Sequence, residues 1–144
     1  MCIRDRYLRC FEAQLALQGG RAGEALSILR DLATRSALLD TNSLDATVRT
    51  RLALAELADG SPKAAWEALE PLIARVVATG HVGQVLVTGV QALTELSLAP
   101  WEGAASRQGL AALRQWIEIA QRFKAGAVER PPASAANDLS LIHI

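Results

Sequence analysis

The feature of this sequence that most constrains its fold is an internal repeat with a period of 40 residues. When the sequence is aligned with itself at an offset of 40 residues, several identical residues coincide, among them Ala13 with Ala53, Leu17 with Leu57, Gly20 with Gly60, Ala25 with Ala65, Leu29 with Leu69, and Leu32 with Leu72. Small residues recur where two helices would cross, a glycine recurs at the turn, and leucines recur along the second helix. This pattern is typical of helical hairpins stacked as a solenoid. The alternative is a chance similarity between Ala/Leu-rich amphipathic helices.

A third copy of the repeat is weaker, because Pro100 replaces the turn glycine and Gly109 replaces Leu69. The composition also favours helix: the chain is 51% hydrophobic and only 4% aromatic, and alanine and leucine dominate. Its 15 basic residues balance 15 acidic ones, so the formal net charge is zero. A neutral chain gives no electrostatic reason to expect nucleic-acid or anionic-membrane binding. No apolar stretch approaches the roughly 18 to 20 residues that a membrane span needs.

Apolar residues with a helical period, separated by turn-forming residues, predict six helices. They are expected at residues 7–18, 21–39, 44–58, 62–78, 82–98 and 104–123. At the clearest turn, Gly60 suits a left-handed C-cap, Ser61 an N-cap and Pro62 the first helical position. Pro71 lies within the fourth helix and predicts a kink or a broken turn at residues 67–71. The fifth helix is apolar almost all round and should be covered on most sides.

The two ends of the chain differ in residue pattern from the Ala-, Leu- and Arg-rich sequence between them. MCIRDR, residues 1–6, resembles a translated transposase-based sequencing adapter, and LSLIHI, residues 139–144, resembles the translated reverse complement of the same oligonucleotide. We therefore expect both ends to be non-native and residues 7–138 to be an internal fragment of a longer protein. Within it, residues 7–123 form the predicted helical-repeat domain, and residues 124–138 have the Ala/Pro-rich composition of a linker.

Residues that carry chemistry are sparse. Cys2 and Cys10 frame neither a disulfide scaffold nor a zinc site, and His81 has no second ligand near it in the sequence. Cys10 is expected in the core of the first helix and His81 in a solvated turn. The chain has no nucleophile beside a positioned base and no phosphate-binding loop, because Gly19 and Gly20 belong to a helix turn. We expect no enzyme activity, no metal and no cofactor.

Two polar stripes are the candidate ligand or partner surface. One stripe lies on the fifth predicted helix and the other on the third; their residues are Gln84, Thr88, Gln91 and Glu95, and Asp45, Arg49 and Glu56. First helices of repeat pairs line the concave wall of a solenoid, where ligands and peptides bind. The alternative is that both stripes are the solvated faces of their helices. Trp66 and Trp116 are expected in the core, and Trp101 as either a partner contact or a cover over a hairpin end.

Residues 52–72, LALAELADGSPKAAWEALEPL, resemble the tetratricopeptide-like region of large LuxR-family transcriptional regulators of the MalT type. Repeats of that region carry a short turn and an "EAL…L.PL" second helix, which Glu24-Ala25-Leu26 and residues 67–72 resemble. Residues 128–138, VERPPASAAND, look like the linker that leads to the DNA-reading module of such regulators. The resemblance implies an all-α, tetratricopeptide-like right-handed solenoid of about six helices.

The function that this resemblance implies is signal sensing or protein interaction in a bacterial LuxR-family regulator. A protein or small-molecule effector would bind the concave face, and DNA would be bound only through a C-terminal module absent from this chain. The alternative is a tetratricopeptide-type scaffold or adaptor unrelated to transcription. We expect a cytoplasmic protein with no membrane partner. Repeats without their neighbours should be marginally stable and prone to self-association, because the end faces are open.

Overall fold

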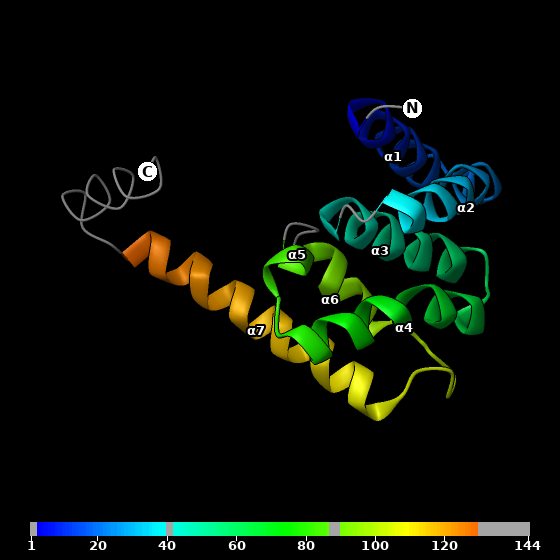
Figure 1. Ribbon diagram of the computed structural model, residues 1–144. Helices are drawn as coiled ribbons and strands as arrows, with labels where there is room; N and C mark the ends of the chain where they lie inside the picture. Colours follow the sequence, from blue (N-terminus) through cyan, green and yellow to red (C-terminus); the bar gives the residue numbers. More distant parts are fainter. Residues whose placement is uncertain (1–2, 40–41, 87–89, 130–144) are drawn as a thin grey trace.

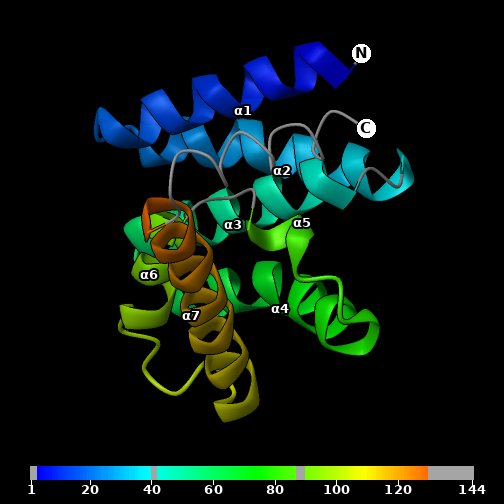
Figure 2. The same ribbon diagram turned by 90° about the vertical axis from the view of Figure 1, so that its left-hand side faces the viewer.

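The computed structural model describes residues 3–39, 42–86 and 90–129, and all regular structure in those residues is helical (Figure 1). The first two hairpins consist of α1 (Ile3–Gln18) with α2 (Ala22–Leu39) and α3 (Asn42–Ala58) with α4 (Pro62–Thr79). The short helix α5 (Gly83–Leu86) and α6 (Val90–Leu98) precede the long helix α7 (Arg107–Glu129). The expected all-α class is confirmed, and the hairpins are stacked as in a solenoid (Figure 2).

The turns of the first two hairpins have the same backbone geometry. Gly20 and Gly60 both adopt left-handed backbone conformations, with φ of 77° and 83°. Four backbone hydrogen bonds recur with the 40-residue offset. They are Gly19 N–H to the Leu15 carbonyl and Asp59 N–H to Ala55, Gly20 N–H to Leu17 and Gly60 N–H to Leu57, Arg21 N–H to Ala16 and Ser61 N–H to Glu56, and Ala25 N–H to Arg21 and Ala65 N–H to Ser61. Such bonds satisfy helix-end carbonyls in a left-handed cap. The predicted role of Gly60 is confirmed.

Ser61 occupies the N-cap of α4, as predicted, but its side chain makes no capping hydrogen bond. The first turn of α4 is held by the backbone, since the Ser61 carbonyl accepts from the Ala65 N–H at 3.0 Å. Pro62 follows within the first two helical positions, where its missing N–H leaves no bond unmade.

Helix α3 lies between two hydrophobic clusters, one on each side. Val48, Leu52 and Ala55 pack with residues of α1 and α2, including Leu29. On the other side, Ala53 joins residues of α4, α6 and α7, as does Ala46. A helix with two apolar faces of this kind connects successive hairpins, because each face buries against a different neighbour.

Three buried tryptophans pack in the hydrophobic cluster of the third copy of the repeat. Trp66 and Trp101 are buried, and their rings meet edge to face with centroids 5.2 Å apart. The Trp101 indole N–H donates to the Leu96 carbonyl at 2.8 Å, so Trp101 covers the end of the hairpin that α6 forms with α7. Trp116 is buried as well, which confirms the expected core role of Trp66 and Trp116.

Gly109 explains why the third copy departs from the repeat. A Cβ atom at this position would lie 2.4 Å from Cη2 and Cζ2 of Trp66. Trp66 stands where the first copy has Leu26, and Gly109 stands where the second has Leu69. The larger side chain at one position therefore requires the absence of a side chain at the other.

Three details of the expected helices differ in the structure. Helix α4 continues from Pro62 to Thr79 through Pro71, which is exposed, so there is no broken turn, and the kink that was the other expectation stays a prediction. Buried residues on both sides of Pro71, such as Leu69 and Ile73, hold the two halves in one helix. The single fifth helix is replaced by α5 and α6, with residues 87–89 outside the described part. Helix α7 extends to Glu129, beyond the predicted end at Phe123.

Candidate functional site

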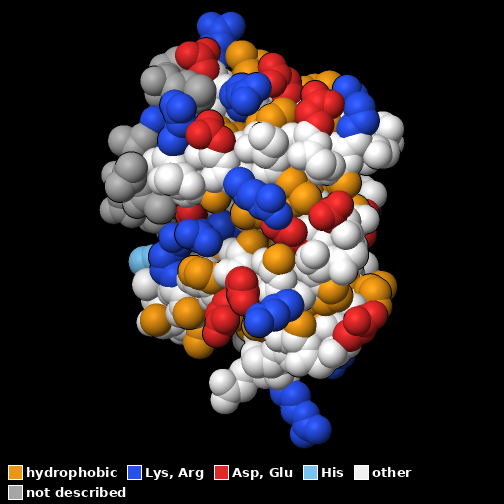
Figure 3. Space-filling view, turned by 90° about the vertical axis from the view of Figure 1, so that its right-hand side faces the viewer, with side chains coloured by type: hydrophobic (Ala, Val, Ile, Leu, Met, Phe, Trp, Pro, Cys, Tyr) orange, Lys and Arg blue, Asp and Glu red, His pale blue; other side chains and the backbone are white. Residues whose placement is uncertain are grey.

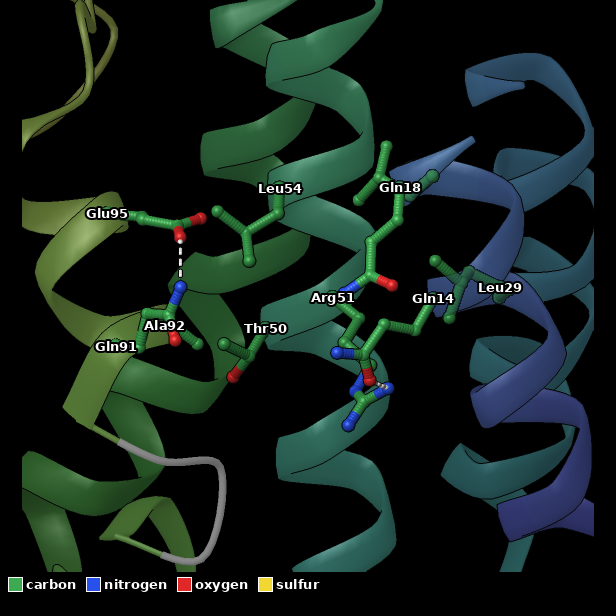
Figure 4. Close-up of a pocket in the computed structure, with 11 residues that line it drawn as sticks. Gln14, Gln18, Leu29, Thr50, Arg51, Leu54, Gln91, Ala92 and Glu95 are labelled. Carbon is green, nitrogen blue, oxygen red and sulfur yellow. Dashed lines mark hydrogen bonds between the residues drawn. The ribbon is translucent and has the colours of Figure 1, made fainter. Parts of the chain in front are cut away.

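A groove of about 520 Å³ lies between α1, α3 and α6. These are the first helices of the three hairpins, and they contribute most of its wall (Figure 4). Its lining residues are Ala13, Gln14, Leu17 and Gln18 of α1, Leu29 of α2, Thr50, Arg51 and Leu54 of α3, and Gln91, Ala92 and Glu95 of α6. We call this hollow the first-helix groove. The volume lies within the range of pockets that hold small ligands.

Arg51 connects the α1 and α3 walls of the first-helix groove. Its Nη1 donates to Gln14 Oε1 and lies 3.5 Å from the backbone carbonyl oxygen of Cys10. Thr50, beside it, is buried, and its hydroxyl donates to the Ala46 carbonyl at 2.6 Å. Thr50 is therefore occupied within its own helix, whereas the partly buried guanidinium of Arg51 lies at the surface of the groove (Figure 4).

The α6 wall of the groove carries an amide and an acid. The Gln91 side-chain amide donates to Glu95 Oε1 at 3.3 Å, and both side chains are exposed. Figure 4 places this pair across α3 from Gln14 and Gln18. The groove thus presents a cation from α3, an acid from α6 and amides from both walls, over apolar residues such as Leu54. Such a surface suits a ligand with polar groups on an apolar frame.

A second hollow of about 460 Å³ lies toward the start of α1. Arg51 lines both hollows, and Cys10, whose backbone carbonyl oxygen lies 3.5 Å from Arg51 Nη1, lines the second one. Tyr7, Leu8 and Phe11 give it an apolar wall, opposite Thr47 of α3. Burial raises the pKa of the Cys10 thiol, against a smaller opposing effect of the Arg51 charge. Cys10 is therefore a core residue, as predicted, with its thiol in the neutral form at neutral pH.

The predicted stripe on the third helix lies between helices. Asp45 is 4% exposed and accepts from Arg49 at 3.1 Å and from Arg75 of α4 at 2.9 Å. Glu56 is also 4% exposed and accepts from Arg30 of α2 at 2.7 Å. These residues face α2 and α4, away from the first-helix groove. They are not the solvated face that the alternative interpretation expects.

Arg49 has a second partner, because its Nη1 donates to the Ala68 carbonyl of α4 at 3.2 Å. Together with Asp45 and Arg75, it ties α3 to α4 by charged hydrogen bonds. A carboxylate that accepts from two guanidinium groups is satisfied within the fold. The stripe on the third helix is therefore a structural ion-pair network, and its assignment as a binding surface stays a prediction without a geometric basis.

The stripe on the fifth predicted helix is divided. Gln91 and Glu95 line the first-helix groove. Gln84 belongs to α5, its side chain lies outside the described part of the chain, and Thr88 lies outside the described residues altogether. Sequence reasoning missed Gln14, Gln18, Thr50 and Arg51. For Arg51 the repeat held a signal, because a 40-residue shift carries Gln91 onto Arg51.

On the face of the described residues seen in Figure 3, basic and acidic side chains are interspersed. Within residues 3–39, 42–86 and 90–129, no group of three His, Cys, Asp or Glu residues is placed to hold a metal ion. His81 is exposed after α4, and its backbone N–H donates to the Thr79 hydroxyl at 3.3 Å.

Among the described helices, none combines the length and the hydropathy that crossing a bilayer requires. Comparison with known proteins gives no further guide: no family model, no curated protein and no solved structure matches the chain.

Proposed function

We propose that this chain is the effector-binding helical-repeat region of a bacterial LuxR-family transcriptional regulator of the MalT type, and that the effector binds in the first-helix groove. The observation that carries the binding role is the groove itself, lined by Arg51, Gln91 and Glu95 from two different hairpins. A ligand that contacts both hairpins would favour one relative placement of α3 and α6. Binding would then change the arrangement of the repeats and be transmitted to attached domains.

The groove chemistry defines the class of effector. Arg51 offers guanidinium donors to a carboxylate, and the amides of Gln14, Gln18 and Gln91 both donate and accept hydrogen bonds. Leu17 and Leu54 supply apolar contact between them. A short peptide, or a small molecule with one acidic group on an apolar frame, satisfies all three features.

Binding can be tested with a panel of blocked tetrapeptides that carry one acidic residue among apolar ones. We expect some of them to raise the melting temperature of the protein, because a ligand of the native state stabilises it. Arg51→Met should abolish the shift, whereas Lys63→Met, at an exposed position outside the groove, should retain it. An equal loss in both variants, or no shift with any peptide, would contradict a groove site.

The regulator assignment has a separate test in the source gene. We would amplify the source DNA across the codons for Asn137 and Asp138 and read onward. A helix-turn-helix module beginning near an "R-E-x-E-V-L" sequence is the expected result. Further repeats, or a different domain, would favour the scaffold or adaptor alternative, which keeps the groove but not the link to transcription.

A further inference from the structure

The outer side of α1 carries an apolar stripe. Leu8, Phe11 and Leu15 are 56%, 59% and 50% exposed, although each has a large apolar side chain. Their spacing of three and four residues places them on one side of the helix. Single exposed leucines are ordinary on protein surfaces, but three aligned on one helix form a continuous face that water solvates poorly.

The repeat identifies what covers such a face. A shift of 40 residues carries Leu8 onto Val48 and Leu15 onto Ala55 of α3, whereas Phe11 is carried onto Arg51, which bonds to Gln14 of α1. Both Val48 and Ala55 are fully buried, and both belong to the cluster that contains the core residues of α2. The face of α3 that corresponds to the open face of α1 is therefore the one that packs against α2, the second helix of the preceding hairpin.

The other side of α1 confirms this register. Ala13 is fully buried within its own hairpin, and so is its equivalent Ala53 of α3. The turns after α1 and α3 also share their hydrogen bonds at the same offset. Because one face and the turn correspond residue by residue, the remaining face corresponds as well. On α3 it is covered, and on α1 it is open.

We infer that the face of Leu8 and Leu15 is a docking surface for an amphipathic helix, placed against α1 as α2 is placed against α3. Phe11 lies at the edge of this face, because its equivalent Arg51 contacts α1. The occupant is the second helix of another hairpin of this repeat. Leu8 and Leu15 are larger than Val48 and Ala55, so the docking helix carries smaller residues opposite them than α2 does. Glu12 replaces Leu52 in the middle of the face, so a polar or basic residue is expected opposite it.

This inference does not depend on the first-helix groove or on an effector. It can be tested by placing a copy of residues 1–40 in front of Met1, which puts a second α2 at the native 40-residue spacing. Two extended proteins are needed. One keeps α1 unchanged, and the other carries Leu8→Val, Glu12→Leu and Leu15→Ala, so that α1 presents the residues by which α3 contacts α2.

The measurement is the midpoint of urea unfolding, followed by circular dichroism. Both extended proteins are expected to unfold at higher urea than the parent chain, with the matched one highest. If the matched protein is stabilised and the unchanged one is not, the face is not a docking surface of this kind. If the matched protein is not stabilised either, the register argument fails and the inference fails with it.

A pair of polar substitutions sharpens the test. Leu8→Ser with Leu15→Ser should leave the midpoint of the parent almost unchanged, because both side chains are half exposed, and should remove most of the gain in the extended protein. Equal effects in the two contexts would overturn the inference. So would sedimentation showing that the parent forms a dimer which these serines dissociate, because the occupant would then be a second copy of the chain.

Discussion

The hairpins α1–α2 and α3–α4 share a turn but differ in how their helices are connected. In the second hairpin, Asp45, Arg49 and Arg75 form a network between α3 and α4. The residues 40 positions earlier are Asp5, Arg9 and Arg35, again one aspartate and two arginines. There, however, Arg9 pairs with Glu12 at 2.8 Å and Arg35 with Asp31 at 3.3 Å, both within a single helix.

This difference shows which features of a repeat are local. The turn depends on a glycine and on backbone groups within a few residues, so it recurs wherever the sequence recurs. The ion pairs depend on the depth of burial and on the neighbours, and the first hairpin has a neighbouring hairpin on one side only. Exposed pairs within a helix contribute little to stability, whereas pairs removed from water are stronger but costly to disrupt.

The largest effect expected from this comparison is on core leucines. Leu69→Ala should cost about 3 to 5 kcal/mol, and the equivalent Leu29→Ala about 2 to 3 kcal/mol. Both leucines are 1% exposed, but Leu69 packs in the cluster that joins residues of α3, α4, α5, α6 and α7, whereas Leu29 borders the first-helix groove. Chemical unfolding of the two variants measures the difference.

The tryptophans allow the two hairpins to be followed separately, because all three belong to the cluster of α4, α6 and α7. Leu29→Ala should shift the circular dichroism transition to lower denaturant more than it shifts the tryptophan fluorescence transition. Leu69→Ala should shift both together. Equal losses and coincident transitions in both variants would mean that the chain unfolds as one unit and that the hairpins do not differ.

Gly109→Ala should cost about 1 to 3 kcal/mol, the usual penalty for excess volume in a packed core. The added methyl group would lie 2.4 Å from two ring carbons of Trp66. Trp66→Leu, which restores the residue type of Leu26 in the first hairpin, should make room for it. In a double-mutant cycle we therefore expect Gly109→Ala to be tolerated better in the Trp66→Leu background. Additive losses would show that the two positions do not compensate each other.

Much of the fold could be predicted because the residues that define the repeat act through their own backbone conformation and their spacing along the chain. Gly20 and Gly60 mark turns through their own backbone conformation, and the apolar period marks the buried side of each helix. Pro71 does not break its helix, because the effect of a proline depends on context: buried apolar residues on both sides of it keep the two halves in one helix. The end of α7 has no clear termination signal in the sequence, since the Ala-rich residues after Phe123 suit a helix as well as a linker.

The candidate site was harder to predict for a physical reason. A polar stripe on a helix has the same spacing whether it faces water or a charged partner. Asp45 and Glu56 are buried because Arg75 and Arg30, which are distant in sequence, lie opposite them. No spacing within α3 reveals these partners. Gln91 and Glu95 were predicted because they interrupt an otherwise apolar helix with a regular spacing, whereas Arg51 belongs to no such polar stripe.

The two turn glycines should respond alike. Gly20→Ala and Gly60→Ala should each cost about 1 to 2 kcal/mol, because a side chain in the left-handed region meets its own backbone. No atom lies within 4 Å of an added Cβ at either position, so packing should not distinguish them. Thermal unfolding of both variants tests this, with Gly23→Ala as the control inside a helix. A clear difference between the two losses would mean that the turns are less alike than their hydrogen bonds.

The smallest effect is expected where Cys10 of α1 corresponds to Thr50 of α3. Both side chains are buried, and the Thr50 hydroxyl donates to the carbonyl four residues earlier. Cys10→Thr should therefore cost less than about 1 kcal/mol, because the new hydroxyl can donate to the Arg6 carbonyl in the same way. Cys10→Val, of the same shape but without a donor, is the matched control, and denaturant unfolding compares them. If threonine is tolerated much worse than valine, the surroundings of the first helix differ from those of the third even where the backbone and the register agree.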